Sequence, residues 1–263
     1  MPIPSAHHDV LYTQIQQQLK QPPTEPILID VEGTLYVLKC ARTEAGRWWR
    51  EQLSALSCRW LFGIRIKAHQ LRAGDIHYEA SRLKKLHQLG LAVPQIYIQQ
   101  PNYIVMEHCG DTVEYLIKHQ DPIPLLKQAV DSLIDLHTAH QWHGGAQLRN
   151  LTYKAQRMYR IDFEETIGET LPLGLAQAYD VLLFFNSLTK YIQHEAELGE
   201  HLLSRYLAQV HTPQLRQSLW QVHTHLQRLQ RLLPYIGQRL RNSTEVQRSI
   251  YFAQLLERCL VTA

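Results

Sequence analysis

Residues 143–164 read HGGAQLRNLTYKAQRMYRIDFE, and the expected architecture of the whole chain can be built outward from them. Two runs that favour β-structure, 150–153 and 158–163, lie on either side of a short polar turn. This pattern predicts a β-hairpin. Asn150 and Asp162 lie at the edges of these runs, where a polar side chain can face a cleft instead of the core.

Helical patterns surround this hairpin on both sides. Before it, 113–118 and 124–140 carry apolar residues at helical intervals, and the same spacing returns at 175–192 and over most of 202–261. Residues 110–263 therefore predict a mainly helical lobe.

The N-terminal region mixes β and helical patterns. After a proline-rich break at 21–26, β-rich runs at 27–31 and 34–39 surround a glycine turn and predict a hairpin. A helix is expected between Asp75, a suitable N-cap, and Gly90, a suitable C-terminal stop.

Two further strands are expected at 93–98 and 103–107, around a proline turn. With one further short strand they would complete a small sheet of about five strands. The chain is therefore expected to be an α+β protein with two lobes, a β-rich lobe at 1–109 and a helical lobe at 110–263.

The composition is that of an ordinary globular chain. Of 263 residues, 45% are hydrophobic and 19% are charged, so the chain can bury a sizeable core and is not expected to be disordered. The net charge of +3 gives no reason to expect nucleic acid as a partner. No CxxC pair and no apolar run of about 18 residues occur, so we expect a cytoplasmic protein without a zinc cage, disulfide framework or membrane span.

One segment differs from the rest of the chain in its charge and its tryptophan content. Residues 42–72 hold seven Lys or Arg against two Asp or Glu, together with Trp48, Trp49 and Trp60. Two interpretations stay open: a basic surface that docks to anionic lipid or sugar phosphate, or tryptophans packed in the core. The first interpretation implies peripheral contact with the inner face of an anionic membrane.

Four polar residues occur in a particular order, each at the end or edge of an apolar element. Lys39 ends a Val-Leu-Lys strand, Glu79 lies in the expected helix, Asn150 closes HGGAQLRN, and Asp162 lies in IDFE. In this order and at these intervals, the four residues resemble the motifs of the protein kinase-like superfamily.

The likeness is closer to one branch of that superfamily. From 36 to 185 the chain resembles the lipopolysaccharide kinases, that is, the Kdo and core-heptose kinases. RIO-type kinases are more distant relatives in this resemblance. LGLAVP at 89–94 resembles the end of the family's Glu-bearing helix, and Met106-Glu107 resembles the segment that connects the lobes. Asp180 resembles the buried helix Asp that braces the catalytic loop.

The resemblance implies a two-lobed kinase-like fold with a nucleotide cleft between the lobes. Lys39, held by Glu79, would position the phosphates of ATP, and Glu107 would contribute to the same cofactor site. Asn150 and Asp162 would hold Mg²⁺, which prefers hard oxygen ligands. The acceptor that the likeness implies is a lipid-linked sugar or a protein.

Two features of the family are missing. Gly145 stands where the family has its catalytic Asp, and a positioned base contributes typically about 10²–10⁴-fold in rate. Three nearby residues could replace the catalytic base: Glu164, Glu165 and His143. We expect Glu164 to be the base, and we expect His143 to pack beneath the metal-binding loop. A glycine-rich phosphate loop is also missing, since Gly33 is the only glycine in the first 45 residues.

Two other functions therefore stay open. One is a pseudokinase that binds nucleotide or a partner and regulates without phosphoryl transfer. The other is an unrelated helical binding module, in which Lys39, Glu79, Asn150 and Asp162 would not converge.

Overall fold

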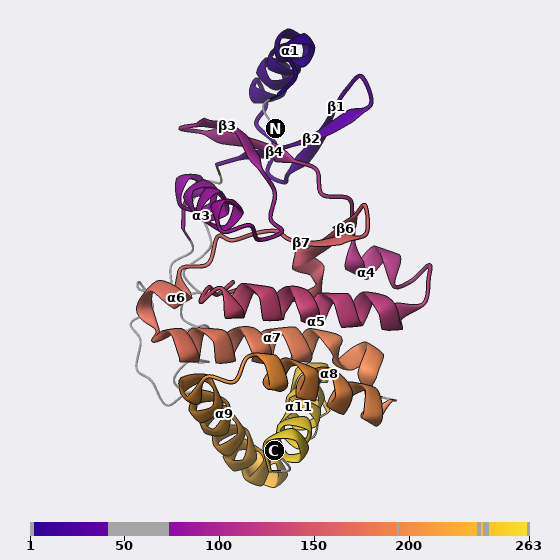
Figure 1. Cartoon of the computed structure of the whole chain (residues 1–263), viewed down its shortest axis with the longest axis vertical. Coiled ribbons are helices and arrows are strands. Elements are labelled where there is room, and N and C mark those ends of the chain that lie inside the picture. Colours follow the sequence, from indigo (N-terminus) through magenta and orange to yellow (C-terminus); the bar gives the residue numbers. More distant parts are fainter. Residues whose placement is uncertain (1–2, 42–73, 194, 236–237, 239–241, 262–263) are drawn as a thin grey trace.

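The computed structural model describes residues 3–41, 74–193, 195–235, 238 and 242–261. Within them, the chain forms an N-terminal part built on a small antiparallel sheet and a C-terminal part that is mainly helical (Figure 1). The expected mixture of α and β structure is confirmed. No helix in these ranges is long and apolar enough to cross a membrane. The basic segment expected at 42–72 lies outside the described residues.

The N-terminal sheet has four antiparallel strands within the described ranges, where about five were expected. Their spatial order is β1 (Ile27–Val31), β2 (Thr34–Cys40), β4 (Tyr103–Glu107) and β3 (Ile96–Gln100). The segment before β1 forms a helix, α1 (His8–Leu19), because its apolar residues recur at a helical interval in a glutamine-rich sequence. In the part of the chain described, no strand therefore precedes β1.

The predicted hairpin of β1 and β2 is confirmed. Val31 pairs with Thr34, so Glu32 and Gly33 alone form the turn, with φ of 51° and 80°. A two-residue turn with positive φ at both positions matches the twist of the flanking strands. Gly33 N also donates a hydrogen bond to Asp30 Oδ1 at 2.8 Å.

Alternate residues of β2 face opposite sides of the sheet. On one side Leu38 and Cys40 are buried together with Leu11 and Ile15 of α1. On the other side, facing α3 (Ile76–Gln88), lies Lys39. Figure 1 shows α1 and α3 on opposite sides of the sheet. Lys39 therefore points to the side on which the C-terminal part lies.

Helix α3 begins and ends where the sequence predicts. Asp75 caps it by accepting a hydrogen bond from Tyr78 N at 2.8 Å, and Gly90, just beyond its end, has a φ of 78°. Glu79 and Arg82 are buried together with the apolar face of the helix. A charged stripe of α3 therefore faces protein and not solvent.

The C-terminal part begins with a second small sheet in the order β5 (Asp111–Thr112), β6 (Leu151–Lys154) and β7 (Arg157–Arg160). The hairpin predicted around 154–157 is confirmed. Its second strand ends at Arg160, whereas the β-pattern extends to 163, because Asp162 adopts a left-handed φ of 67° that does not fit a strand.

Helices complete the described structure, and the predicted helical regions are confirmed for the residues that it describes. In chain order the remaining elements are η1 (Ser5–His7), α4 (Val113–Leu116), α5 (Pro122–Thr138), η3 (Leu148–Asn150), α6 (Ile167–Thr170), α7 (Leu173–Ile192), α8 (Ala196–Gln209), α9 (Pro213–Leu232), η4 (Leu233–Tyr235) and α11 (Thr244–Val261). Helix α7 packs against α5, α8, α9 and α11. It is therefore the central helix of the C-terminal core.

Candidate functional site

Lys39 is the centre of the candidate site. Its Nζ lies 2.6 Å from Glu79 Oε2, 2.9 Å from Asp162 Oδ1 and 3.8 Å from Glu164 Oε2. Strand β2 supplies the lysine, α3 supplies Glu79, and the segment after β7 supplies the other two acids. The geometry is inconsistent with a module in which Lys39, Glu79 and Asp162 stay apart.

Burial and neighbouring charges have opposite effects on the pKa values in this cluster. Lys39 is only 6% exposed and Glu79 is 1% exposed. Burial lowers the pKa of Lys39, but Glu79 and Asp162 raise it by more, so the ammonium stays charged. Burial raises the pKa of Glu79 against the attraction of Lys39. Glu79 Oε1 is a buried oxygen without a hydrogen-bond partner in the described structure.

Asp162 has a backbone conformation that few residues other than glycine adopt. Its φ of 67° lies in the left-handed region, which costs an ordinary residue about 1–2 kcal/mol. The flanking backbone is held in place, since Ile161 N donates to Asn150 O at 3.0 Å. This fixed conformation accompanies the approach of the Asp162 carboxylate to Lys39.

Both ring nitrogens of His143 are engaged. Nε2 donates to Ile161 O at 3.0 Å, and Nδ1 accepts from Gly145 N at 3.1 Å, which defines a neutral tautomer. The ring centroid lies 4.2 Å from that of Phe163. His143 therefore packs beneath the segment that carries Asp162, and in this arrangement neither nitrogen is left to take a proton from a substrate.

Asp180 holds the loop that begins at His143. Its two carboxylate oxygens accept hydrogen bonds from His143 N at 2.6 Å and from Gly144 N at 2.7 Å. Burial raises the pKa of this carboxyl, but His137 and His143 outweigh burial and lower it. Asp180 lies on the central helix α7, so it ties the loop to the rigid core.

Asn150 lies at the other end of the same loop. Its Nδ2 donates to Gly145 O at 2.8 Å, which leaves the amide oxygen as the atom that suits a cation. The backbone bond from Ile161 to Asn150 places the loop beside the Asp162 segment. Asn150 therefore neighbours the acidic cluster through the backbone.

Glu164 lies on the Lys39 side of the site. With Lys39, Asp75 and Glu79 it lines a small cavity of about 60 Å³. One carboxylate oxygen from each of Glu79, Asp162 and Glu164 lies within 4.8 Å of the others, a spacing that suits a cation. The structure thus groups Asp162 with Glu79 and Glu164 more directly than with Asn150.

Glu107 ends strand β4, where the chain leaves the N-terminal sheet. Its Oε1 lies 3.4 Å from Lys154 Nζ, which also donates to His108 O at 2.8 Å. Both groups are partly exposed. The Glu107 side chain is therefore paired with β6 and does not reach the cluster around Lys39 through any contact described.

Arg82 was not predicted to belong to the site. Its Nη2 donates to Trp142 O at 2.7 Å, and its guanidinium carbon lies 4.1 Å from the Trp142 ring centroid. Gly168 packs against the same ring so closely that a Cβ there would lie 2.1 Å from it. Arg82 follows Glu79 by three residues, so both share a helix face, but periodicity cannot distinguish a buried arginine from an exposed one.

Two more contacts fasten α3 to the segment after Asp162. Gly74 N donates to Glu164 O at 2.6 Å, and the Tyr78 hydroxyl donates to Glu169 Oε1 at 3.1 Å. Together with Arg82 they hold α3, and hence Glu79, in one orientation relative to the C-terminal part.

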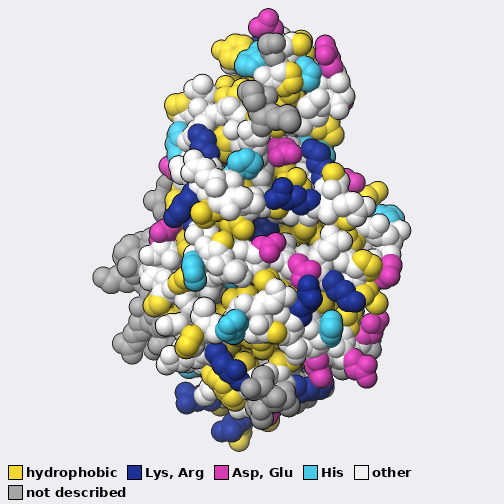
Figure 2. Space-filling model, in the orientation of Figure 1, with side chains coloured by type: hydrophobic (Ala, Val, Ile, Leu, Met, Phe, Trp, Pro, Cys, Tyr) yellow, Lys and Arg dark blue, Asp and Glu magenta, His cyan; other side chains and the backbone are white. Residues whose placement is uncertain are grey.

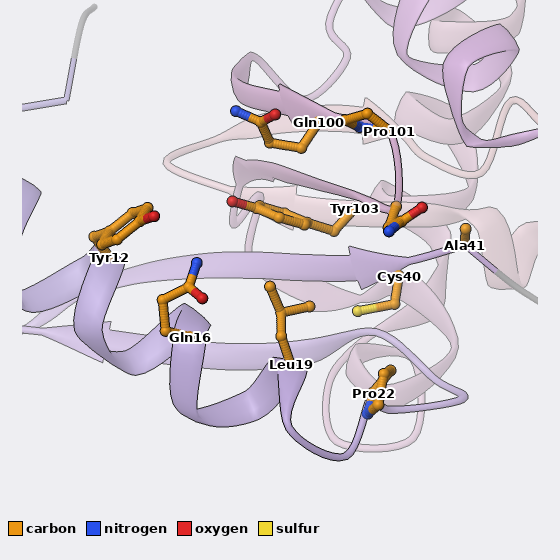
Figure 3. Close-up of a pocket in the computed structure, with 10 residues that line it drawn as sticks. Tyr12, Gln16, Leu19, Pro22, Cys40, Ala41, Gln100, Pro101 and Tyr103 are labelled. Carbon is orange, nitrogen blue, oxygen red and sulfur yellow. The ribbon is translucent and has the colours of Figure 1, made fainter.

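A cavity of about 650 Å³ lies on the α1 side of the sheet (Figure 3). Cys40 lines this cavity, whereas its neighbour Lys39 points to the opposite face. The described residues that line it are uncharged: Tyr12, Gln16, Leu19, Pro22, Cys40, Ala41, Gln100, Pro101, Asn102 and Tyr103.

The surface seen in Figure 2 carries Lys and Arg side chains interspersed with Asp and Glu. On this face the described residues form no extended region of one sign. Charged side chains also gather in the interior, in the buried cluster around Lys39.

We expect the free energy of unfolding to rise with pH between about pH 4 and about pH 6.5. Burial lowers the pKa of His143 from 6.5 to about 4, so in this window the unfolded chain binds a proton that the folded protein does not. This shift corresponds to about 3 kcal/mol. Urea unfolding across the window should show the slope.

The matched variants for this measurement are His143→Gln and His119→Gln. The first should flatten the slope, although His137, whose pKa burial also lowers, should keep part of it. The second makes the same change at an exposed histidine and is the control for the substitution itself. A His143→Gln slope equal to that of the wild type would contradict the neutral, buried state of His143.

Comparison with known proteins adds one similarity. No protein family's sequence profile matches the chain. Over 152 residues the chain is 27% identical to a protein of Haemophilus influenzae described as an uncharacterized protein. The match covers 56% of this chain and 60% of that protein's length. Function therefore has to be argued from the site.

Proposed function

We propose that this protein is an ATP-dependent phosphotransferase with a two-lobed kinase-like fold, of the lipopolysaccharide-kinase type. The observation that carries the proposal is the buried ion pair of Lys39 and Glu79, with Asp162 2.9 Å from the same ammonium. A lysine oriented by a carboxylate can donate to phosphate oxygens, and an adjacent Asp can serve the metal ion that accompanies them.

The residues around Lys39 fit Mg²⁺ by their chemistry. Three carboxyl groups, those of Glu79, Asp162 and Glu164, lie together beside one ammonium, and carboxylate oxygens are the ligands that Mg²⁺ prefers. We propose that Asp162 holds the ion, with Glu164 or the amide oxygen of Asn150. Bound Mg²⁺ would offset the negative charge of the phosphates.

An apolar surface lies on the Lys39 face of the sheet. Leu28 is paired directly with Val37, so both face the side to which Lys39 points, and Leu28 is 56% exposed. An exposed leucine beside a phosphate-binding lysine suits the flat apolar ring of a nucleotide base. We propose that the base of ATP lies against these two residues.

A pseudokinase is the second candidate, because Gly145 offers no side chain to accept a proton. Such a protein would bind nucleotide or a partner through the same cluster and regulate without transfer. For the enzyme, the acceptor class that we propose is a hydroxyl of a lipid-linked sugar, with a protein as the alternative.

Calorimetric titration with ATP tests the proposal. With Mg²⁺ present we expect a micromolar dissociation constant, a binding free energy of about 8 kcal/mol. EDTA should weaken the binding strongly, because phosphates next to three carboxylates need the cation. Absence of heat at millimolar Mg·ATP would overturn both the enzyme and the nucleotide-binding pseudokinase.

A further inference from the structure

Gly144 and Gly145, at the start of the loop held by Asp180, differ in the room that their neighbours leave for a side chain. A Cβ placed on Gly145 would meet Asn150 Nδ2 at 3.5 Å, Glu165 Cγ at 3.6 Å and His143 Nδ1 at 3.7 Å. These are ordinary van der Waals distances, so a Cβ at position 145 fits without a clash.

The side chain that already lies there is that of Glu165. A Cβ placed on Gly144 would come within 2.7 Å of Glu165 Cβ, so the stem of Glu165 packs directly against the glycine pair. Gly144 has a φ of 87°, a backbone conformation that favours glycine, and the lack of a side chain at 144 allows this contact. Glu165 is half-buried, so it contacts the loop and still borders solvent.

Glu164 and His143, the other acid and base near the loop, face other groups. Glu164 faces the cavity beside Lys39 and Glu79, and both nitrogens of His143 bond to the backbone. The segment that carries Glu165 is held in place, since the backbone oxygen of Glu164 accepts from Gly74 N.

We propose that Glu165 is the catalytic base of the phosphoryl transfer and occupies the place that an acidic side chain at 145 would fill. This inference rests on the proposed function. The acceptor hydroxyl gives its proton to the Glu165 carboxylate while its oxygen forms a bond to the γ-phosphorus of ATP. The bond from that phosphorus to the β,γ-bridging oxygen breaks, ADP leaves, and the proton passes from Glu165 to solvent.

The test compares three variants by Mg·ATP binding and by ADP release, with water or an added sugar alcohol as the acceptor. Glu165→Gln should lower turnover by about 10²–10⁴-fold and leave the nucleotide dissociation constant within about threefold. Glu164→Gln is the matched neighbour and should act mainly on nucleotide binding. Gly145→Asp added to Glu165→Gln should restore part of the turnover, which a merely structural role of Glu165 would not allow.

The outcomes separate this inference from the proposed function. Wild-type turnover that persists in Glu165→Gln would overturn the role of Glu165. Tight Mg·ATP binding without any wild-type turnover would also overturn it, and would favour the pseudokinase. Failure of the wild type to bind Mg·ATP would instead overturn the proposed function itself.

Discussion

Replacing Lys39 with alanine should lower the affinity for Mg·ATP by roughly a hundredfold. The ammonium is proposed to donate about two charge-assisted hydrogen bonds to phosphate oxygens, each worth about 1.5–3 kcal/mol. Since about 1.4 kcal/mol corresponds to a factor of ten, two such bonds account for at least that loss. Calorimetric titration of the variant gives the dissociation constant.

The variant needs a control for folding, because Lys39 also neutralises Glu79. A buried carboxylate that loses its partner is strongly destabilising, so Lys39→Met combined with Glu79→Gln removes both charges together. Lys190→Ala removes an exposed lysine paired with Glu114 and should bind Mg·ATP as the wild type does. An unchanged affinity in a folded Lys39 variant would mean that the phosphates bind elsewhere.

Local patterns predicted most of the elements. The hairpin around Glu32-Gly33 follows from a glycine turn between two β-rich runs, and α3 follows from its cap at Asp75 and its stop at Gly90. These features depend on neighbours in the sequence, so they can be recognised without knowledge of the fold. The described residues supply four strands of that sheet, and the further short strand that would make about five is not among them.

The candidate site was predicted only in part. Lys39, Glu79 and Asp162 converge as expected, whereas the contact described for Asn150 with this segment is a backbone hydrogen bond from Ile161. The left-handed φ of Asp162 is set by tertiary contacts on both sides, which residue order does not reveal. The β-pattern therefore continued through a position where the strand has already ended.

Contacts between distant polar residues were the hardest to predict. Arg82 reaches Trp142 across the two parts of the chain, and Glu165 packs against Gly145. Among the acids near Gly145, sequence position favours Glu164, but the chain turns so that Glu164 and Glu165 face different neighbours. Only the geometry distinguishes two adjacent glutamates.

The largest loss of stability is expected for Asp180→Ala. The carboxylate is fully buried, and besides two backbone N–H groups it lies 3.3 Å from His137 Nε2. Its removal leaves these donors without an acceptor in the interior, and we expect a loss of about 3–5 kcal/mol. That is a large fraction of the usual stability of about 5–15 kcal/mol. Urea unfolding near pH 7 measures it.

Two further variants show why the loss should be so large. Asp180→Asn keeps one carbonyl oxygen for one N–H group but turns an amide NH₂ toward the other. Its free energy of unfolding should therefore lie between those of the wild type and Asp180→Ala. Asp131→Ala removes an exposed carboxylate paired with Arg205 and should cost no more than about 1 kcal/mol. Because interactions with His137 and His143 lower the pKa of Asp180, its contribution is complete at neutral pH and is lost only as the pH falls through that lowered pKa. Equal stabilities of the Asp180 and Asp131 variants would mean that α7 does not hold the loop at His143 and Gly144.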